Sequence, residues 1–381
     1  MSLTRRPAQP RKRIAHVSTF PPLRCGIASF VSDLIFATPD FEHIRYALHY
    51  GDLGAGEAHA HADVNFVGKV AELAQVISAS DCDVVSLQHE FGIWGGREGE
   101  HIHAFLENLT KPLLSVLHTT FGPGVRSVVQ DNIIRCLIRQ SAMVIVLTEA
   151  SKQTAEMLYG ERIKHMVVVP HGVPDFPYVP PPPAWGIEAR EGRSPIRLIT
   201  PGFFRQDKGF ETILYALRDL QDGGYNLSYR IAGEPQRQFG GQAPYRAQIE
   251  DLIELLKLGS VVQIDGRYLS VAEQAASIRT AHLGIFGYQD PSQASSGTVP
   301  LVMSMGRPVL CTPFEYAKAR AQDGPGVFLT NDFDSAAIAS AIERFMGING
   351  YTTLAMATYS RTRVWTWTAV GNTFASLYRL L

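Results

Sequence analysis

The stretch IRLITPGFFRQDKGFETIL (196–214) decides the fold of this chain. It passes from an apolar run of strand length through a basic loop into apolar residues at helical spacing. Gly202 and Gly209 let the loop bend, and Arg205 and Lys208 place two cations in it. In a parallel α/β sheet, anionic ligands settle where such a loop leads into a helix. The stretch predicts a pyrophosphate site, although a solvated surface turn would explain the loop equally well by itself.

A second loop of similar character follows in the run QASSGTVPLVMSM (293–305). Ser295, Ser296, Gly297 and Thr298 offer hydroxyl groups and unobstructed backbone amides where a helix is predicted to begin. A turn of this composition is more often a plain helix cap. Because two such loops occur in succession, we expect them to hold one ligand together.

The run then continues through GRP (306–308) into the apolar strand VLC (309–311). This order of elements resembles the C-terminal half of retaining glycosyltransferases of family 4, which have the two-domain GT-B fold. The resemblance extends over nearly the whole chain. It implies that Arg205 and the Lys208-Gly209 pair bind the diphosphate of a nucleotide-sugar donor.

The chain departs from the family pattern at three positions. The usual arginine beside the first glycine is replaced by Phe203, and the usual pair of glutamates is replaced by Gln293 and Leu301. The sequence is therefore similar to a subgroup that lacks these acids. The residues assigned to the donor are Cys25, Gly26, Gly202, Gly209, Tyr268, Gln293, Ser295, Ser296, Gly297 and Thr298.

Length and composition agree with two globular domains. The chain has 381 residues, of which 45% are hydrophobic and 19% are charged. The net charge of −1 argues against a protein that binds nucleic acid through many phosphates. The apolar runs are shorter than a membrane span, and the four cysteines lack metal-ligand spacing, so we expect a cytoplasmic protein.

Strand-like and helical segments alternate in both halves, which predicts an α/β fold. With the resemblance, we expect two Rossmann-like, doubly wound parallel-sheet domains facing a central cleft. The predicted segments are a disordered basic tail (1–12), an N-terminal acceptor-side domain (13–174), a proline-rich linker (175–195), a C-terminal donor-binding domain (196–354) and a helix that packs back toward the first domain (355–381).

Three segments of the first half carry candidate site residues. PPLRCGIASF (21–30) lacks the glycine triplet of dinucleotide enzymes, and the resemblance implies that Cys25 and Gly26 approach the donor. QHEFGIWGG (88–96) combines a carboxylate with aromatic rings, so Glu90, Phe91 and Trp94 are predicted to bind a sugar acceptor. A buried structural turn explains Phe91 equally well.

His118 ends the strand PLLSVLHT (112–119), where the resembled family has a histidine that contacts the donor sugar. We therefore assign His118, Arg205 and Lys208 to catalysis, and interpret His171 as a structural residue near the interdomain hinge. His101 and His103 alternate with apolar residues, but two histidines without a third ligand seldom hold a metal.

The resemblance implies transfer of a hexose to a saccharide or lipid-linked saccharide with retention of anomeric configuration. No metal or other cofactor is expected, because protein cations can neutralise the diphosphate. Two other functions stay open, a nucleotide-sugar epimerase of GT-B fold and a non-catalytic member that binds a nucleotide or a protein. The basic tail also leaves open a weak peripheral contact with the inner face of the membrane, although a solvated tail is favoured.

Overall fold

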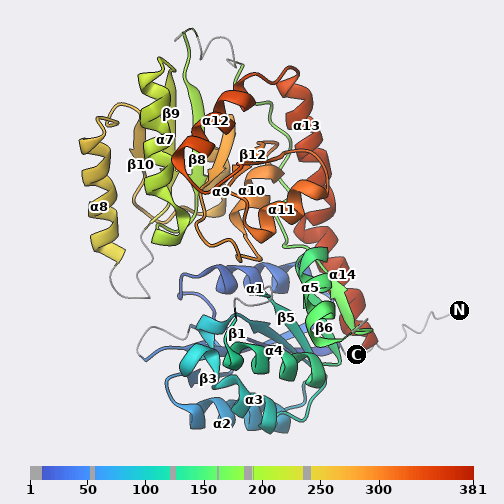
Figure 1. The fold of residues 1–381 in the computed structure, drawn as a ribbon. Coiled ribbons are helices and arrows are strands. Elements are labelled where there is room, and N and C mark those ends of the chain that lie inside the picture. Colours follow the sequence, from blue (N-terminus) through green and yellow to red (C-terminus); the bar gives the residue numbers. More distant parts are fainter. Residues whose placement is uncertain are drawn as a thin grey trace, which may run out of the picture. The chain divides into compact units, whose positions relative to one another are not determined.

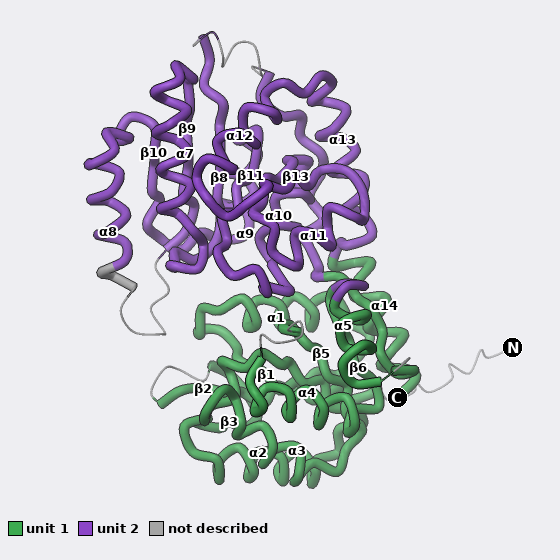
Figure 2. The backbone as a smooth tube through the Cα atoms, viewed as in Figure 1, with its two compact units in different colours: residues 1–147, 151–170, 367–381 green, residues 148–150, 171–366 purple. Residues whose placement is uncertain are grey.

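The computed structural model divides the chain into two compact units, which Figures 1 and 2 show. Unit 1 comprises residues 1–147, 151–170 and 367–381, and unit 2 comprises residues 148–150 and 171–366. The residues that the structure describes are 11–51, 56–120, 126–160, 163–183, 191, 193–234 and 242–381. Most of the predicted basic tail and part of the predicted linker lie outside these residues. No helix in the described parts of the chain has the length and apolar character needed to cross a membrane.

Unit 1 is built on a seven-stranded sheet in which all neighbouring strands are parallel. The strand order is β3-β2-β1-β4-β5-β6-β7, so the direction of winding reverses between β1 and β4. The strands are β1 (Arg13–Ser18), β2 (Glu42–His49), β3 (Ala60–Asp63), β4 (Val84–His89), β5 (Leu113–Leu117), β6 (Met143–Val146) and β7 (Met166–Val168). The helices are α1 (Gly26–Ala37), α2 (Val67–Ala79), α3 (Ile102–Asn108), α4 (Val128–Gln140), α5 (Glu149–Tyr159) and α14 (Trp367–Leu380).

Helices cover both faces of this sheet because the side chains of each strand alternate between two apolar cores. One core is shared with α2, α3 and α4, and the other with α1 and α14. Val370, Phe374 and Leu377 form the buried face of α14, and the hydroxyl of Tyr378 lies 2.9 Å from that of Ser86 on β4. The last helix therefore completes the core of unit 1.

Unit 2 repeats the architecture with a six-stranded parallel sheet in the order β10-β9-β8-β11-β12-β13. The winding reverses between β8 and β11. The strands are β8 (Ile196–Pro201), β9 (Leu227–Ala232), β10 (Val262–Ile264), β11 (Leu283–Phe286), β12 (Val309–Cys311) and β13 (Val327–Leu329). The helices are α7 (Phe210–Asp222), α8 (Gln242–Leu255), α9 (Val271–Arg279), α10 (Thr298–Ser304), α11 (Glu315–Gln322), α12 (Ser335–Met346) and α13 (Tyr351–Arg361).

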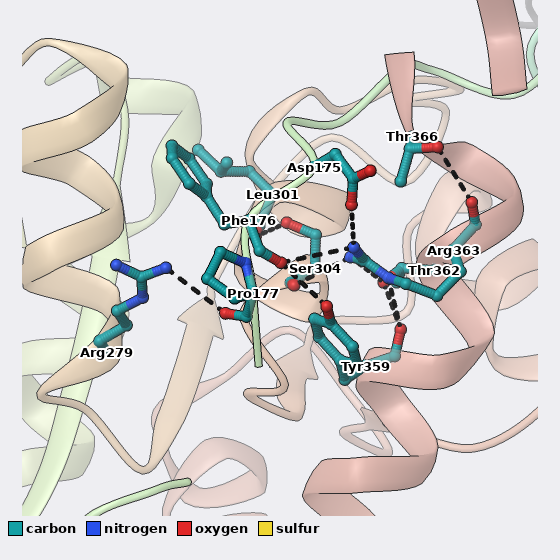
Figure 3. A network of polar contacts seen from close by, with 10 residues as sticks. All are labelled: Asp175, Phe176, Pro177, Arg279, Leu301, Ser304, Tyr359, Thr362, Arg363 and Thr366. Atoms are coloured by element: carbon teal, nitrogen blue, oxygen red, sulfur yellow. Dashed lines mark hydrogen bonds and ion pairs between the residues drawn. The ribbon is translucent and has the colours of Figure 1, made fainter. Parts of the chain in front are cut away.

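Arg363 anchors the segment by which the chain enters unit 2 (Figure 3). Its guanidinium lies 2.7 Å from a carboxylate oxygen of Asp175 and donates to the backbone carbonyl of Ser304 at the end of α10. The same guanidinium stacks 3.9 Å from the ring centroid of Tyr359, whose hydroxyl donates to the carbonyl of Phe176. These contacts fix the start of the predicted linker against α10 and α13.

Candidate functional site

The two loops predicted to bind phosphate follow β8 and β11, the pair of strands between which the winding of unit 2 reverses. Open parallel sheets bind ligands at the carboxyl ends of such a pair of strands. The chain leaves these two strands in opposite directions, which opens a crevice between the two loops. The fold therefore brings the two predicted loops to one edge of the sheet.

Glycines allow close approaches between these loops. A Cβ atom on Gly209 would lie 1.9 Å from the carbonyl oxygen of Gly287, and one on Gly202 would lie 3.0 Å from the methyl group of Thr298. Both glycines have positive φ, at +64° and +118° respectively. The loops after β8 and β11 therefore lie against each other, and their predicted grip on one ligand stays a prediction.

Asp207 lies between the two predicted phosphate ligands and pairs with both. Its carboxylate accepts from Nε and Nη2 of Arg205 at 2.7 and 2.9 Å, and Nζ of Lys208 lies 3.2 Å away. Burial raises the pKa of Asp207, but the neighbouring Lys208 and Arg205 outweigh it and the net pKa is lowered. The carboxylate stays ionised and holds both cations in the loop.

The predicted hydroxyl loop has a defined internal structure. The hydroxyl of Ser296 accepts from the backbone N–H of Val299 at 3.2 Å and lies 3.4 Å from that of Thr298. The side-chain amide of Gln293 donates to the carbonyl of Ser295 at 3.0 Å. Ser296 therefore holds the first turn of α10 from the residue before its N-cap, Gly297, while the Thr298 side chain faces Gly202.

Two further residues of unit 2 concern the donor. Tyr268, assigned to the donor by the resemblance, follows β10 and is 43% exposed. His171, interpreted as structural, packs beside the hydroxyl loop, where its Nε2 would lie 3.1 Å from a Cβ on Gly297. Its Nδ1 donates to the carbonyl of Gly172 at 2.8 Å, and burial lowers the pKa of His171.

In unit 1, His118 follows the carboxyl end of β5 and is 5% exposed. Its Nε2 donates to Oε1 of Gln88 at 2.8 Å, and its ring packs edge-on against Phe30 of α1, with 4.7 Å between ring centroids. The predicted contact of His118 with the donor sugar stays a prediction. The structure adds that Gln88 holds the imidazole in place.

The loops after β1 and β4 carry the other predicted residues of unit 1. Cys25 caps α1, because its thiol accepts from the N–H of Ala28 at 3.3 Å, and burial raises the pKa of this thiol. Gly26 has no atom within 4 Å of a built Cβ, so space remains beside it. Glu90 caps a short 3-10 turn by accepting from the N–H of Gly92 at 2.7 Å.

The structure does not place Trp94 in an acceptor shelf. Its side chain is fully buried in the unit 1 core, packs edge-on against Phe105 and donates through Nε1 to the carbonyl of Gln88 at 3.2 Å. A sugar has no access to this ring, which corrects the predicted role. Phe91 is 6% exposed and packs edge-on against His89, so the structural interpretation of Phe91 is favoured.

Within the described ranges, no group of three or more His, Cys, Asp or Glu side chains is arranged to hold a metal ion. His101 instead makes a structural contact, because its Nδ1 donates to the carbonyl of Val64 at 2.8 Å.

No model of a known protein family matches the chain. It is 31% identical over 166 residues to the GDP-mannose:glycolipid 4-beta-D-mannosyltransferase of Xanthomonas campestris pv. campestris. This match covers 42% of the chain and spans less than half, 44%, of that relative.

Solved structures match nearly the whole chain. Anabaena HepE in complex with UDP and glucose has a TM-score of 0.73 at 17% identity, with 97% of this chain and 100% of the other covered. Sucrose-phosphate synthase from Thermosynechococcus elongatus has a TM-score of 0.74 at 17% identity, with 97% and 99% covered. The chain has the GT-B fold. The predicted fold class, with two parallel-sheet α/β domains, is confirmed.

Sequence reasoning missed Asp207, Gln88 and Tyr288, which contact the predicted ligands Arg205, Lys208, His118 and Thr298. Asp207 could have been found, because it stands between the two cations. Gln88 could have been found by strand alternation, which places it on the face of β4 opposite to His89. Tyr288 follows β11, but no sequence pattern tells which loop it contacts.

Proposed function

We propose that the chain is a glycosyltransferase that moves a hexose from a nucleotide diphosphate sugar to a saccharide or lipid-linked saccharide, with retention of anomeric configuration. The observation that carries this proposal is the meeting of two phosphate-type loops at the switch point of unit 2. One loop supplies Lys208 and Arg205, and the other supplies the Thr298 hydroxyl and neighbouring amides.

The donor class follows from this chemistry. A diphosphate needs cations and hydrogen-bond donors, and Tyr268 offers an exposed ring to a base of either kind. The Xanthomonas relative is named for GDP-mannose, and the HepE structure holds UDP, so both nucleotides are candidates for this chain.

In the proposed reaction, the bond between the anomeric carbon and the β-phosphate oxygen breaks as the acceptor oxygen bonds to that carbon. The electron pair leaves with the nucleoside diphosphate, where Lys208 and Arg205 stabilise the growing negative charge. The departing phosphate oxygen accepts the acceptor's proton on the same face of the sugar. Lys208 and Arg205 then neutralise the charge that a metal ion would otherwise neutralise, and we propose that transfer is metal-independent.

The stereochemical outcome has a specific alternative. The name of the Xanthomonas relative specifies a β-linked mannose, and a β-linked product from an α-linked donor would mean inversion. An inverting reaction needs a protein base on the acceptor side. Glu90 is the carboxylate that stands at the carboxyl end of β4, so Glu90→Gln would abolish an inverting transfer but spare a retaining one.

The test is a turnover assay of the purified chain with UDP-, GDP- and ADP-sugars, lipid-linked and soluble acceptors, and excess EDTA. We expect transfer from one nucleotide class, and proton NMR of the product would give the anomeric configuration. A covalent sugar–protein adduct would contradict same-face attack, and a strict requirement for a divalent metal would contradict the role of the cations.

The same assay separates the alternative functions. Interconversion of the donor sugar without any acceptor would identify an epimerase. Nucleotide binding measured by calorimetry without turnover on any acceptor would favour a non-catalytic protein.

A further inference from the structure

Tyr288 belongs to the loop after β11 and contacts both Lys208 of the loop after β8 and Thr298 at the start of α10. Its ring centroid is 3.8 Å from Nζ of Lys208, and its hydroxyl is 3.1 Å from the hydroxyl of Thr298. The residue follows β11 at the switch point of unit 2. One side chain therefore joins the cation of the first loop to the hydroxyl of the second.

Tyr288 is itself held firmly. It is 2% exposed, its ring stacks on Phe314 with 4.9 Å between centroids, and its backbone carbonyl accepts from the hydroxyl of Thr312 at 2.6 Å. The next residue, Gln289, donates its backbone N–H to the carbonyl of Asp207 at 3.2 Å. The ring is a fixed platform against which the flexible lysine side chain is placed.

The contact with the ring face leaves the ammonium group suited to bind an anion. An ammonium has three N–H donors. Among the described residues, Nζ of Lys208 lies 3.2 Å from Asp207 and 3.8 Å from the Tyr288 ring centroid, and the proposed site uses a further N–H for a phosphate oxygen. A buried cation–π contact attracts the ammonium without adding negative charge that would repel the diphosphate.

We propose that Tyr288 is the positioning residue of the donor diphosphate site, fixing Lys208 through its ring face and Thr298 through its hydroxyl. This inference rests on the proposed function. The ring of Tyr288 is assigned to Lys208 and its hydroxyl to Thr298. Substitutions can therefore remove the ring contact and the hydroxyl contact separately.

The experiment is a pair of double-mutant cycles on the full chain, with UDP and GDP binding measured by calorimetry. Tyr288→Leu removes the ring and should weaken binding of the preferred nucleotide roughly tenfold, the range of a buried cation–π contact. In a Lys208→Met background the same change should have less than about a twofold effect, because the cation is gone.

The second cycle isolates the hydroxyl. Tyr288→Phe keeps the ring and should weaken binding roughly threefold to fivefold, as expected for one neutral hydrogen bond. In a Thr298→Val background its effect should fall below about twofold. Tyr215→Phe, on an exposed tyrosine of α7, serves as the matched control and should leave binding unchanged.

The outcomes separate this inference from the proposed function. Equal losses in both backgrounds would show that Tyr288 only supports the fold, and unchanged binding in Tyr288→Phe and Tyr288→Leu would also overturn the inference. If the wild-type chain binds neither UDP nor GDP, the proposed function fails first. Should Tyr288→Leu not fold, the cycle between Tyr288→Phe and Thr298→Val decides.

Discussion

Units 1 and 2 both have parallel sheets with one reversal of winding, but they differ in the side chains that the loops at that switch point carry. In unit 2, the loops after β8 and β11 are joined through Lys208, Tyr288 and Thr298. In unit 1, the corresponding loops after β1 and β4 use Cys25 and Glu90 to cap their own turns, while Trp94 lies in the core. The edge of unit 2 carries the cations Lys208 and Arg205, whereas at the edge of unit 1 a thiol and a carboxylate cap their own turns.

The difference shows that a phosphate site is easier to predict from sequence than a sugar-binding site. A diphosphate needs positive charge, which lysine and arginine supply through charge-assisted hydrogen bonds. Aromatic and amide side chains bind sugars but also fill cores. The loop predicted to bind the donor packs against the loop after β11, whereas Trp94 of the predicted acceptor shelf is buried in the core.

Trp94→Ala tests the contrast between the two units, because it distinguishes a ring that packs in the core of unit 1 from one that binds an acceptor. We expect Trp94→Ala to lower the free energy of unfolding by about 3–5 kcal/mol, because it leaves a large cavity in unit 1. Urea denaturation measures this, and Phe66→Ala, at an exposed aromatic residue, should change stability by less than about 0.5 kcal/mol. A stable Trp94→Ala protein with weakened acceptor binding would restore the predicted shelf.

Lys208→Ala tests the charged edge of unit 2. A charged hydrogen bond to phosphate contributes roughly 1.5–3 kcal/mol, so diphosphate affinity should fall at least tenfold, and turnover should fall further because charge grows on the leaving group. Both are measured by calorimetry and initial rates with EDTA present. Arg205→Ala should be milder, because Arg205 is offset from the usual arginine position.

The matched control is Arg218→Ala, which removes a surface cation about 12 Å further along the helix that follows the loop. Its binding should equal that of the wild type. If Lys208→Ala also keeps wild-type affinity and rate, the donor site is elsewhere.

His118→Ala tests whether unit 1 contributes to turnover without contributing to diphosphate binding. Turnover should fall strongly, but nucleoside diphosphate affinity should change less than tenfold, or by less than about 1.4 kcal/mol, because the phosphate ligands belong to unit 2. Gln88→Leu should reproduce part of the loss in kcat, since it removes the hydrogen bond between Nε2 of His118 and Oε1 of Gln88. A large loss of diphosphate binding in folded His118→Ala would place this residue among the phosphate ligands.

The smallest expected effect is a difference in acid stability. Burial holds the pKa of His16 well below its usual value and lowers that of His89 to about 3, and both belong to unit 1. Such histidines stay neutral in the folded state, whereas in the unfolded chain they bind a proton below about pH 6.5. Stability is therefore fully present above that pH and is lost as the pH falls toward the folded-state pKa.

At about pH 5.5, protonation of His89 in the unfolded chain should lower the stability of unit 1 by about 1.4 kcal/mol, and His16 should act in the same direction. Hydrogen exchange of the two units at about pH 7.5 and 5.5, corrected for intrinsic rates, measures the effect. The β1–β4 region should lose protection first, and His89→Phe should reduce the loss. Buried His171 acts in the same direction in unit 2, so the contradicting outcome is a loss in the β1–β4 region that His89→Phe leaves unchanged.

The sequence alone determined the two α/β units, the parallel sheets, the phosphate-type loops and the apolar face of the last helix. These features depend on local patterns, such as strand-length apolar runs, glycines at turns and helical spacing, which are complete within about 20 residues. His118 was placed at its strand end for the same reason.

Only the tertiary structure decided which side chains work together. Tyr288 is 80 residues from Lys208 in the sequence, and Gln88 is 30 from His118, so neither contact has a local signature. Trp94 showed the converse, because a buried aromatic ring and one that binds sugar look alike until the fold determines which has access to solvent. Residue types and strand ends are written in the sequence, whereas burial and partnership arise only when distant strands pair, because packing joins residues without regard to their order along the chain.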